Sequence, residues 1–266
     1  VKIAHKDERI CAITAAMKYG TGLQFFSSEI PERFFDVGIA EQHAVTFASG
    51  LASMGLVPVF AVYSSFIQRA FDQLIHDVAI AKTHVVLGID RAGIVGEDGE
   101  THQGMFDVSM LTSIPNTVIY SPSCYEEVRM CLRSAIYDEK GLVAIRYPRG
   151  NDKSEFDKLH LNTEYRFFRK ENADTLLISY GRIFDDVYSA ADKLSDEGIK
   201  CDILKLTKIF PINEQIIPEA KKYKRIIFFE EGYKFGGISE IFGDILIESG
   251  YIGDYSRVAS EGFIRQ

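Results

Sequence analysis

The sequence predicts an α/β fold built from two mostly parallel, three-layer units. Short runs rich in Val, Ile and Phe alternate with longer segments of helical period, the pattern of parallel strands with crossover helices. The alternation stops over a charged, irregular stretch and then restarts. With 266 residues, the chain is long enough for one or two domains with substantial cores. We therefore expect a first domain over 1–150, a linker over 151–164 and a second domain over 165–266.

In the first unit the apolar runs predict strands near 10–15, 33–36, 57–62, 84–89, 117–120 and 142–147. Helices are expected near 41–55, 64–82 and 123–138. The clearest is 64–82, where apolar residues recur with helical spacing: Ile67, Phe71, Leu74 and Val78. In the second unit, strands near 175–180, 201–206 and 225–229 are expected to alternate with helices near 185–198, 213–222 and 238–250.

Composition excludes several classes of partner. Thirty basic against 38 acidic residues give a net charge of −8, without the clustered positive charge of a nucleic-acid binder. Apolar stretches such as 56–63 are far shorter than the roughly 20 residues that span a bilayer, so we expect no membrane partner. Four cysteines without CxxC spacing favour a reducing cytoplasm over a disulfide framework and predict no cysteine metal site.

One carboxylate, Glu41, is expected at a strand-to-helix junction. The helix macrodipole favours a negative charge in the first turn, which is a structural interpretation. Alternatively, a carboxyl held against apolar Val37 and Ile39 is poorly hydrated and can exchange a proton with a ligand nitrogen. Local sequence alone favours the structural interpretation, because structural carboxylates outnumber catalytic ones.

The loop over 91–104 follows a predicted buried strand, where α/β sheets place their sites. It holds four glycines in 14 residues and brings Arg91, Asp98 and His102 together. Asp98 and His102 can handle protons while Arg91 holds an anion. The alternative is a polar surface loop with turn glycines, but long loops in compact α/β units tend to be functional.

Two further sets of residues leave their roles open. Arg146 and Arg149 flank the end of a predicted strand, where guanidinium groups can grip a phosphate; a solvated linker explains them equally well. His43, His76 and His84 lack the spacing of metal ligands, so we expect them to be structural or solvated and predict no metal site in this chain. Neither a P-loop nor a GxGxxG motif is present.

Several motifs together resemble the 1-deoxy-D-xylulose-5-phosphate synthase family of transketolase-like thiamine diphosphate enzymes. They are RFFDVGIAEQHAV (33–45), VYSSFIQRAFDQ (62–73), DRAGIVG (90–96) with THQG (101–104), and RYPRG (146–150). A weaker likeness continues in the second unit through KLTKIFPI (205–212) and FEEG (229–232). The resemblance implies a transketolase pyrimidine-binding domain followed by a transketolase C-terminal domain.

The resemblance implies roles for the cofactor pocket. Glu41 would hydrogen-bond the aminopyrimidine ring of thiamine diphosphate, which leads to loss of the thiazolium proton. Phe66 would stack on the aminopyrimidine, and Ile39 and Arg69 would line the same pocket. A carboxyl shielded from water suits this proton exchange. With the resemblance included, the functional interpretation of Glu41 is preferred.

It also implies a substrate site. Tyr63, Arg91 and Arg149 would hold the phosphate of glyceraldehyde 3-phosphate, since guanidinium groups and a phenol suit a dianion. Asp98 and His102 would contact pyruvate or its adduct, and His102 is the better acid–base candidate of the two. The implied reaction is the decarboxylative condensation of pyruvate with glyceraldehyde 3-phosphate.

The resemblance further implies what lies outside this chain. Family members carry an N-terminal domain whose GDG motif holds Mg²⁺ and the diphosphate, and no GDG occurs here. The chain also begins at Val1 without an initiator Met, so we expect a fragment that is inactive without that domain. A homodimer in the cytoplasm is the family expectation.

Two alternatives remain open. The first is the C-terminal subunit of a split transketolase, or the beta subunit of a 2-oxo-acid dehydrogenase, which share the two-domain arrangement. The second is a non-catalytic α/β binding module in which Glu41 caps a helix and the loop over 91–104 is inert. The second alternative predicts no pocket at Phe66 and no exposed apolar face on the first unit.

Overall fold

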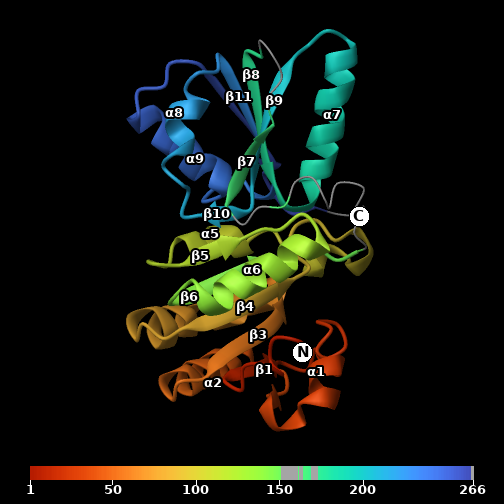
Figure 1. Ribbon diagram of the computed structural model, residues 1–266, viewed down its shortest axis with the longest axis vertical. Coiled ribbons are helices and arrows are strands. Elements are labelled where there is room, and N and C mark those ends of the chain that lie inside the picture. Colours follow the sequence, from red (N-terminus) through yellow and green to blue (C-terminus); the bar gives the residue numbers. More distant parts are fainter. Residues whose placement is uncertain (151–160, 162–163, 169–172, 265–266) are drawn as a thin grey trace.

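Two sheets of mostly parallel strands organise the chain, one above the other in Figure 1. The structure is a computed structural model, and it describes residues 1–150, 161, 164–168 and 173–264. The α/β class predicted from the sequence is confirmed. The predicted linker over 151–164 lies outside the described residues, apart from 161 and 164.

The first sheet has seven strands in the order β10-β5-β6-β4-β3-β1-β2. They are β1 (Ile10–Thr14), β2 (Phe34–Asp36), β3 (Val57–Tyr63), β4 (Val85–Asp90), β5 (Val118–Tyr120), β6 (Leu142–Arg146) and β10 (Lys208–Phe210). Neighbours are parallel except β10, which runs antiparallel to β5. The six strands predicted in the first unit are confirmed. Because β10 comes from the second unit in sequence, this sheet edge joins the two units.

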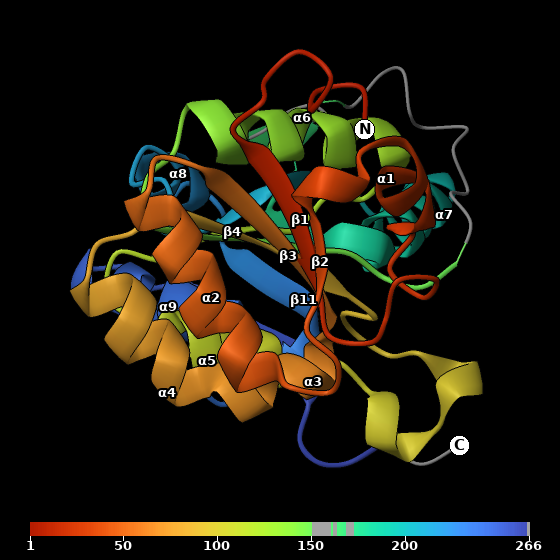
Figure 2. The same ribbon diagram turned by 90° about the horizontal axis from the view of Figure 1, so that it is seen from below.

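Helices cover both faces of the first sheet (Figure 2). One face carries α2 (Glu41–Ser53), α3 (Ser64–Ile67), α4 (Phe71–Gln73) and α5 (Asp107–Thr112), and the other carries α1 (Gln24–Glu29) and α6 (Tyr125–Tyr137). Consecutive residues of a strand point to opposite faces of the sheet: Ile13 belongs to one apolar cluster and Ala12 to the other. This is the alternation that strand geometry dictates.

The helix predicted over 64–82 forms, but not as one regular helix. A 3₁₀ turn at Gln68–Ala70 and a π-helical turn at Leu74–Ile80 follow α3 and α4 respectively. The 3₁₀ turn is tighter than an α-helix and the π-helical turn is wider. The two deviations offset each other, so the apolar side chains stay on one face of the segment. Ile67, Leu74 and Val78 are accordingly all fully buried.

The second sheet has five strands in the order β12-β11-β8-β9-β7. They are β7 (Tyr165–Phe168), β8 (Thr175–Tyr180), β9 (Cys201–Leu206), β11 (Arg225–Tyr233) and β12 (Asp254–Ser260). Figure 1 shows α7 (Phe184–Asp196) on one face and α8 (Ile216–Ala220) with α9 (Ile238–Glu248) on the other. None of the helices in the described part of the chain is both long and apolar enough to cross a bilayer.

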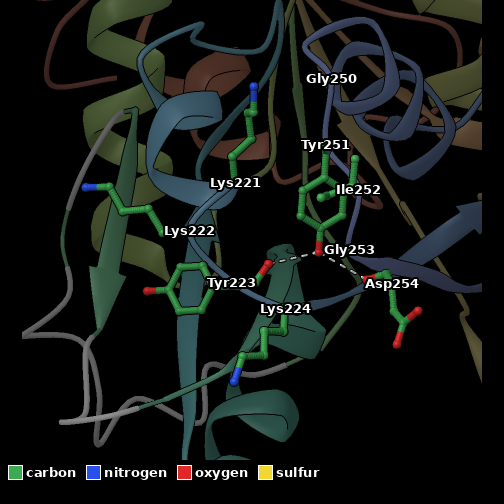
Figure 3. Close-up of a pocket in the computed structure, with 9 residues that line it drawn as sticks. All are labelled: Lys221, Lys222, Tyr223, Lys224, Gly250, Tyr251, Ile252, Gly253 and Asp254. Atoms are coloured by element: carbon green, nitrogen blue, oxygen red, sulfur yellow. Dashed lines mark hydrogen bonds between the residues drawn. The ribbon is translucent and has the colours of Figure 1, made fainter.

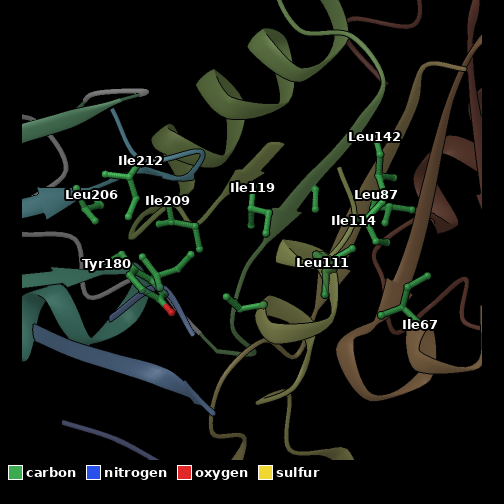
Figure 4. Close-up of a cluster of buried hydrophobic side chains, with 14 of the residues drawn as sticks. Ile67, Leu87, Leu111, Ile114, Ile119, Leu142, Tyr180, Leu206, Ile209 and Ile212 are labelled. Atoms are coloured by element: carbon green, nitrogen blue, oxygen red, sulfur yellow. The ribbon is translucent and has the colours of Figure 1, made fainter. Parts of the chain in front are cut away.

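One apolar cluster runs through both units (Figure 4). It joins Leu111 and Ile119 of the first unit to Tyr180, Leu206 and Ile209 of the second, and all five are buried. Burial of large apolar side chains is the main favourable term in folding. The two units are therefore packed on a shared core, which fixes the second unit against the site of the first.

Candidate functional site

The site residues expected from the sequence gather where parallel strands end. Tyr63 is the last residue of β3, Arg91 directly follows β4, and Arg149 lies three residues after β6. Glu41 begins α2, which follows β2. Parallel strands present their carboxyl ends at one edge of the sheet, and α/β folds place ligand sites there. The carboxyl ends of β2, β3, β4 and β6 thus place side chains in the same region.

Glu41 is buried, with 1 % of its surface exposed, in the first turn of α2. Its Oε1 accepts a hydrogen bond of 2.5 Å from Nη1 of Arg69, whose side chain is 48 % exposed. The expectation that Ile39 shields this carboxyl is wrong, because Ile39 is 81 % exposed. The chain turns at Gly38, which has a φ of 72°, and this turn leaves the Ile39 side chain in solvent.

Three aromatic rings form a cluster next to Arg69. The rings of Tyr63 and Phe66 are stacked, with centroids 5.5 Å apart and planes inclined by 24°. His102 meets Phe66 edge-on at 5.3 Å and Tyr63 at 6.4 Å. The Arg69 guanidinium lies over Phe66, 4.8 Å from the ring centroid. Phe66 therefore connects the Glu41–Arg69 pair to the loop that carries His102.

A second group of charges adjoins Tyr63. The Arg91 guanidinium lies 4.0 Å from the Tyr63 ring centroid, and its Nη1 donates to the carbonyl of Gly20 (2.8 Å) and to Oδ2 of Asp90 (2.9 Å). Asp98 forms a close ion pair with Arg149, and its Oδ2 lies 3.4 Å from Nε of Arg91. The two guanidinium groups expected to bind phosphate thus converge on one carboxylate.

Burial changes the titration of two groups here. It raises the pKa of Asp90, and the adjacent Arg91 offsets part of that rise. It also raises the pKa of the Tyr63 hydroxyl, which Arg91 again opposes. Tyr63 is therefore a protonated hydrogen-bond donor at neutral pH. Arg91 itself has a φ of 59°, a conformation uncommon outside glycine, and its bonds to Gly20 and Asp90 hold it there.

The hypothesis that Asp98 and His102 form a pair is wrong. Asp98 faces arginines, while Nδ1 of His102 lies 3.0 Å from Oγ1 of Thr101, so Asp98 and His102 do not form a pair. A guanidinium is always charged and is the stronger partner for a carboxylate.

Arg146 is also unavailable to a phosphate in solution. It is 3 % exposed, and its Nε donates to Oδ2 of the fully buried Asp107 at 2.9 Å. A buried guanidinium needs such a partner, because an uncompensated charge in the core is costly. His84 is structural as expected, with Nδ1 lying 3.1 Å from the carbonyl of Gly141.

The roles of Gln103 and Arg182 at the site were not predicted from the sequence. Oε1 of Gln103 accepts from the Val95 amide at 2.7 Å across the loop. From the second unit, Nη2 of Arg182 donates to the carbonyl of Ile94 at 3.2 Å and pairs closely with Glu231. A signal for Arg182 was present, since it follows the predicted strand over 175–180 by two residues.

A cavity of about 490 Å³ lies elsewhere, between the turn that precedes β11 and the turn that precedes β12 (Figure 3). Its three lysines are engaged: Lys221 donates to the carbonyl of Ser249, Lys222 pairs with Glu219 at 2.6 Å, and Lys224 pairs with Asp174 at 2.8 Å. It opens at the amino ends of these strands, opposite to the end that carries the site residues, and it shares no residue with them.

Comparison with known proteins follows the same division of the chain. Residues 1–153 match the family described as transketolase, pyrimidine binding domain, and residues 166–260 match the family described as transketolase, C-terminal domain. Among solved structures, a split-gene transketolase in an inactive β4 tetramer superposes with a TM-score of 0.86 at 24 % identity, covering 98 % of this chain and 86 % of that chain. A Campylobacter jejuni transketolase gives 0.82 at 16 % identity, covering 99 % and 41 %. Both likenesses concern the fold.

Curated relatives are more similar in sequence. The 1-deoxy-D-xylulose-5-phosphate synthase of Natranaerobius thermophilus is 47 % identical over 93 % of this chain, and that of Clostridium acetobutylicum is 46 % identical over 91 %. The synthase of Brevibacillus brevis is 43 % identical over 98 %. The chain spans 39 %, 39 % and 41 % of these three relatives. With its two domains matched in order, the chain belongs to the transketolase family, as a pyrimidine-binding domain followed by a transketolase C-terminal domain.

Proposed function

We propose that this chain forms the pyrimidine-binding part of a thiamine diphosphate-dependent 1-deoxy-D-xylulose-5-phosphate synthase. The synthase would join pyruvate to glyceraldehyde 3-phosphate with loss of carbon dioxide. Relatives of that name at 43–47 % identity support the assignment. The observation that carries it is the buried carboxyl of Glu41, bonded to a planar cation that lies over the ring of Phe66.

The contacts of Arg69 provide a test of whether Glu41 and Phe66 fit the cofactor. Its guanidinium is flat, offers N–H groups to Glu41 at 2.5 Å and lies 4.8 Å from the Phe66 centroid. An aminopyrimidine is likewise flat, with nitrogen groups at its edge, and needs the same two contacts. Since the Arg69 side chain is 48 % exposed, little buried surface is lost when it moves aside. Glu41 and Phe66 thus suit an aminopyrimidine ring.

When bound, thiamine diphosphate supplies the electron sink that decarboxylation requires. Glu41 exchanges a proton with a ring nitrogen, and its burial keeps water away from that hydrogen bond. Phe66 orients the ring by stacking. His102 stands edge-on to Phe66 at 5.3 Å, where an imidazole can move a proton on the substrate side.

For the acceptor substrate, we propose that the phosphate replaces Asp98 between Arg91 and Arg149. A phosphate dianion offers more charge and more acceptor oxygens to two guanidinium groups than one carboxylate does. Tyr63, whose ring lies beneath Arg91, supplies a protonated hydroxyl at the same place. Release of Asp98 would then free its carboxylate to face the other substrate.

Mg²⁺ and the diphosphate need ligands from elsewhere. Within residues 1–150, 161, 164–168 and 173–264, no three His, Cys, Asp or Glu side chains are grouped so that they could hold a metal ion. We propose that a separate diphosphate-binding domain supplies them, in a homodimeric enzyme. A cytoplasmic location completes the proposal, supported by a sequence with only four cysteines in 266 residues, too few for a disulfide framework.

The test is to combine the chain with the N-terminal domain of the Natranaerobius thermophilus synthase. Carbon dioxide release from pyruvate is then measured with and without glyceraldehyde 3-phosphate. We expect release that depends on the phosphosugar and on Glu41. Release that is indifferent to the phosphosugar, or none from an intact assembly, would contradict the proposal.

A second candidate is a subunit of a split transketolase, favoured by the 86 % coverage of the split-gene chain. The same assembly distinguishes it. A transketolase would move a two-carbon unit between sugar phosphates and release no carbon dioxide from pyruvate.

A further inference from the structure

The loop over 91–104 is closed at its base by a pair of backbone hydrogen bonds. The amide of Gly93 donates to the carbonyl of Gly104 at 2.8 Å, and the amide of Gly104 donates to the carbonyl of Gly93 at 2.8 Å. Between these bonds the chain makes two 3₁₀ turns, Gly96–Asp98 and Glu100–His102. The orientation of Asp98 and His102 therefore depends on how this base is held.

Side chains of the second unit contact the first segment of the loop base, Gly93 and Ile94. Arg182, just after β8, donates through Nη2 to the carbonyl of Ile94 at 3.2 Å and pairs closely with Glu231 of β11. Glu231 in turn packs on Gly93: a Cβ on that glycine would lie 2.8 Å from Oε2 of Glu231. Glu231 is mostly buried, whereas Arg182 is partly exposed.

The backbone of β11, and a side chain bonded to it, contact the second segment of the loop base, Gly104 and Met105. The amide of Tyr233 donates to the carbonyl of Met105 at 2.9 Å. Nη2 of the buried Arg146 donates to the carbonyl of Glu231 at 3.3 Å and to that of Gly104 at 3.4 Å. Arg146, which is paired with Asp107 in the core, thus holds the backbone of Glu231. The carboxylate of Glu231 lies against Gly93 of the loop. Residues of β11, a strand of the second unit, therefore contact both segments of the loop base.

We propose that Arg182 and Glu231 are positioning residues that hold the loop over 91–104 in the orientation its site residues require. They act through the backbone at Gly93 and Ile94 and touch no reacting atom. The second unit thereby contributes to the site of the first without supplying a group to it. This inference rests on the proposed function for its effect on catalysis, but its structural part does not.

The structural part is tested by amide hydrogen–deuterium exchange on the chain itself. We compare the parent with Arg182→Ala and with a matched control, Arg225→Ala, which removes an exposed arginine from β11 that lies 3.8 Å from Asp254. We expect about tenfold faster exchange over 94–104 in Arg182→Ala alone, as for loss of one or two hydrogen bonds. Unchanged exchange over 94–104 would overturn the proposal. Faster exchange throughout the second unit would also overturn it, because Arg182 would then support the fold rather than the loop.

The catalytic part uses the assembled enzyme. Misplacing site residues by about 1 Å can lower turnover by as much as 10²-fold, so we expect kcat to fall about tenfold or more in Arg182→Ala and Glu231→Gln. The double variant should lose little more than either single variant, because the two act as one unit. Arg182→Lys should recover part of the loss. Additive losses, or a lysine variant as poor as alanine, would contradict a positioning role. Failure of the proposed function would instead abolish parent activity and leave the exchange result unchanged.

Discussion

At Phe66, a single ring contacts residues from different parts of the site. The Arg69 guanidinium, the partner of Glu41, lies over the ring, and the rings of Tyr63 and His102 also contact it. Aromatic stacking is favourable beyond the area that it buries and fixes the relative orientation of the rings. A ligand ring that replaces the Arg69 guanidinium would gain the same contact.

Phe66→Ala should therefore weaken binding of thiamine diphosphate to the assembled enzyme by about two- to tenfold, the equivalent of about 0.5–1.5 kcal/mol for a lost aromatic pair. Isothermal titration with Mg²⁺ and thiamine diphosphate measures it. The matched control is Phe25→Ala, which removes a mostly exposed ring of α1. Equal affinity of Phe66→Ala and the parent for thiamine diphosphate would show that Phe66 does not stack on the cofactor.

Sequence predicted which residues meet here better than it predicted how they pair. Glu41 and Arg91 both follow predicted strands, and parallel strands share a carboxyl edge, whereas Tyr63 was implied by the family resemblance alone. The partners of Asp98 were mistaken, since Arg149 lies 51 residues away in the sequence and only the fold brings it near. Such choices depend on side-chain geometry, which periodicity does not encode.

At the scale of elements, the loop over 91–104 requires glycine at its base. A Cβ on Gly104 would lie 2.0 Å from the carbonyl of Arg91 and 2.8 Å from the side chain of Ser64, so only glycine fits there. At Gly96, by contrast, no atom would lie within 4 Å of a Cβ. The two positions offer a matched pair within one loop.

Gly104→Ala should destabilise the chain by about 1–3 kcal/mol, the usual cost of an overpacked site. Gly96→Ala should be neutral or stabilising by up to about 1 kcal/mol, since it restricts only the unfolded chain. Urea unfolding of both variants measures the difference. Equal effects at the two positions would mean that the base of the loop is not tightly packed.

The sequence failed to predict the strands β7, β10 and β12 and the short helices α1 and α5. β7 and β12 are edge strands of the second sheet whose residues are intermediate or exposed, so they carry no continuous apolar run. β10 has three residues and pairs with β5 of the other unit. Strands of this kind are specified by neighbours rather than by local pattern.

Glu139, two residues after the end of α6, connects β10 to the first unit. Its Oε1 accepts from Nζ of Lys208 at 2.8 Å and from the hydroxyl of Tyr120 at 2.7 Å. Burial alone would raise the pKa of Glu139, but these hydrogen bonds outweigh burial and hold the pKa below its usual range. Stability from this group is therefore complete above the unfolded pKa and is lost as pH falls through the folded one.

Glu139→Gln should accordingly destabilise the chain by about 1–3 kcal/mol at pH 7, as for a hydrogen bond to a charged group. The difference from the parent should shrink as the pH falls below about 4, where the parent carboxylate also becomes protonated. Urea unfolding at a series of pH values measures this. A difference that stays constant down to pH 3 would show that the ionised carboxylate contributes nothing.

For the whole molecule, a buried ion pair accompanies the shared core. Lys205 of β9, 2 % exposed, pairs closely with the fully buried Glu127 of α6, so the pair crosses between the units. Breaking a buried pair leaves a charge without its main partner, whereas an exposed pair contributes little. The two units should consequently unfold in one transition.

Lys205→Met should cost about 3–5 kcal/mol in the free energy of unfolding. The control is Lys224→Met, at an exposed pair with Asp174, where we expect a change within about 1 kcal/mol. Denaturation followed by fluorescence and by circular dichroism measures both. Two separate transitions in the parent, or equal effects of the two substitutions, would contradict a single folding body.

The central claim concerns proton exchange by the Glu41 side chain with the bound cofactor. The direct measurement is the rate at which the thiazolium C2 proton of bound thiamine diphosphate exchanges with deuterated solvent, followed by NMR in the assembled enzyme. Glu41→Gln keeps the shape of the side chain and removes its acid–base function. We expect this substitution to slow exchange by about 10²–10⁴-fold, the usual contribution of a positioned acid or base, while Glu32→Gln, at an exposed acid near β2, leaves the rate unchanged. Equal exchange rates in the parent and Glu41→Gln would contradict the account.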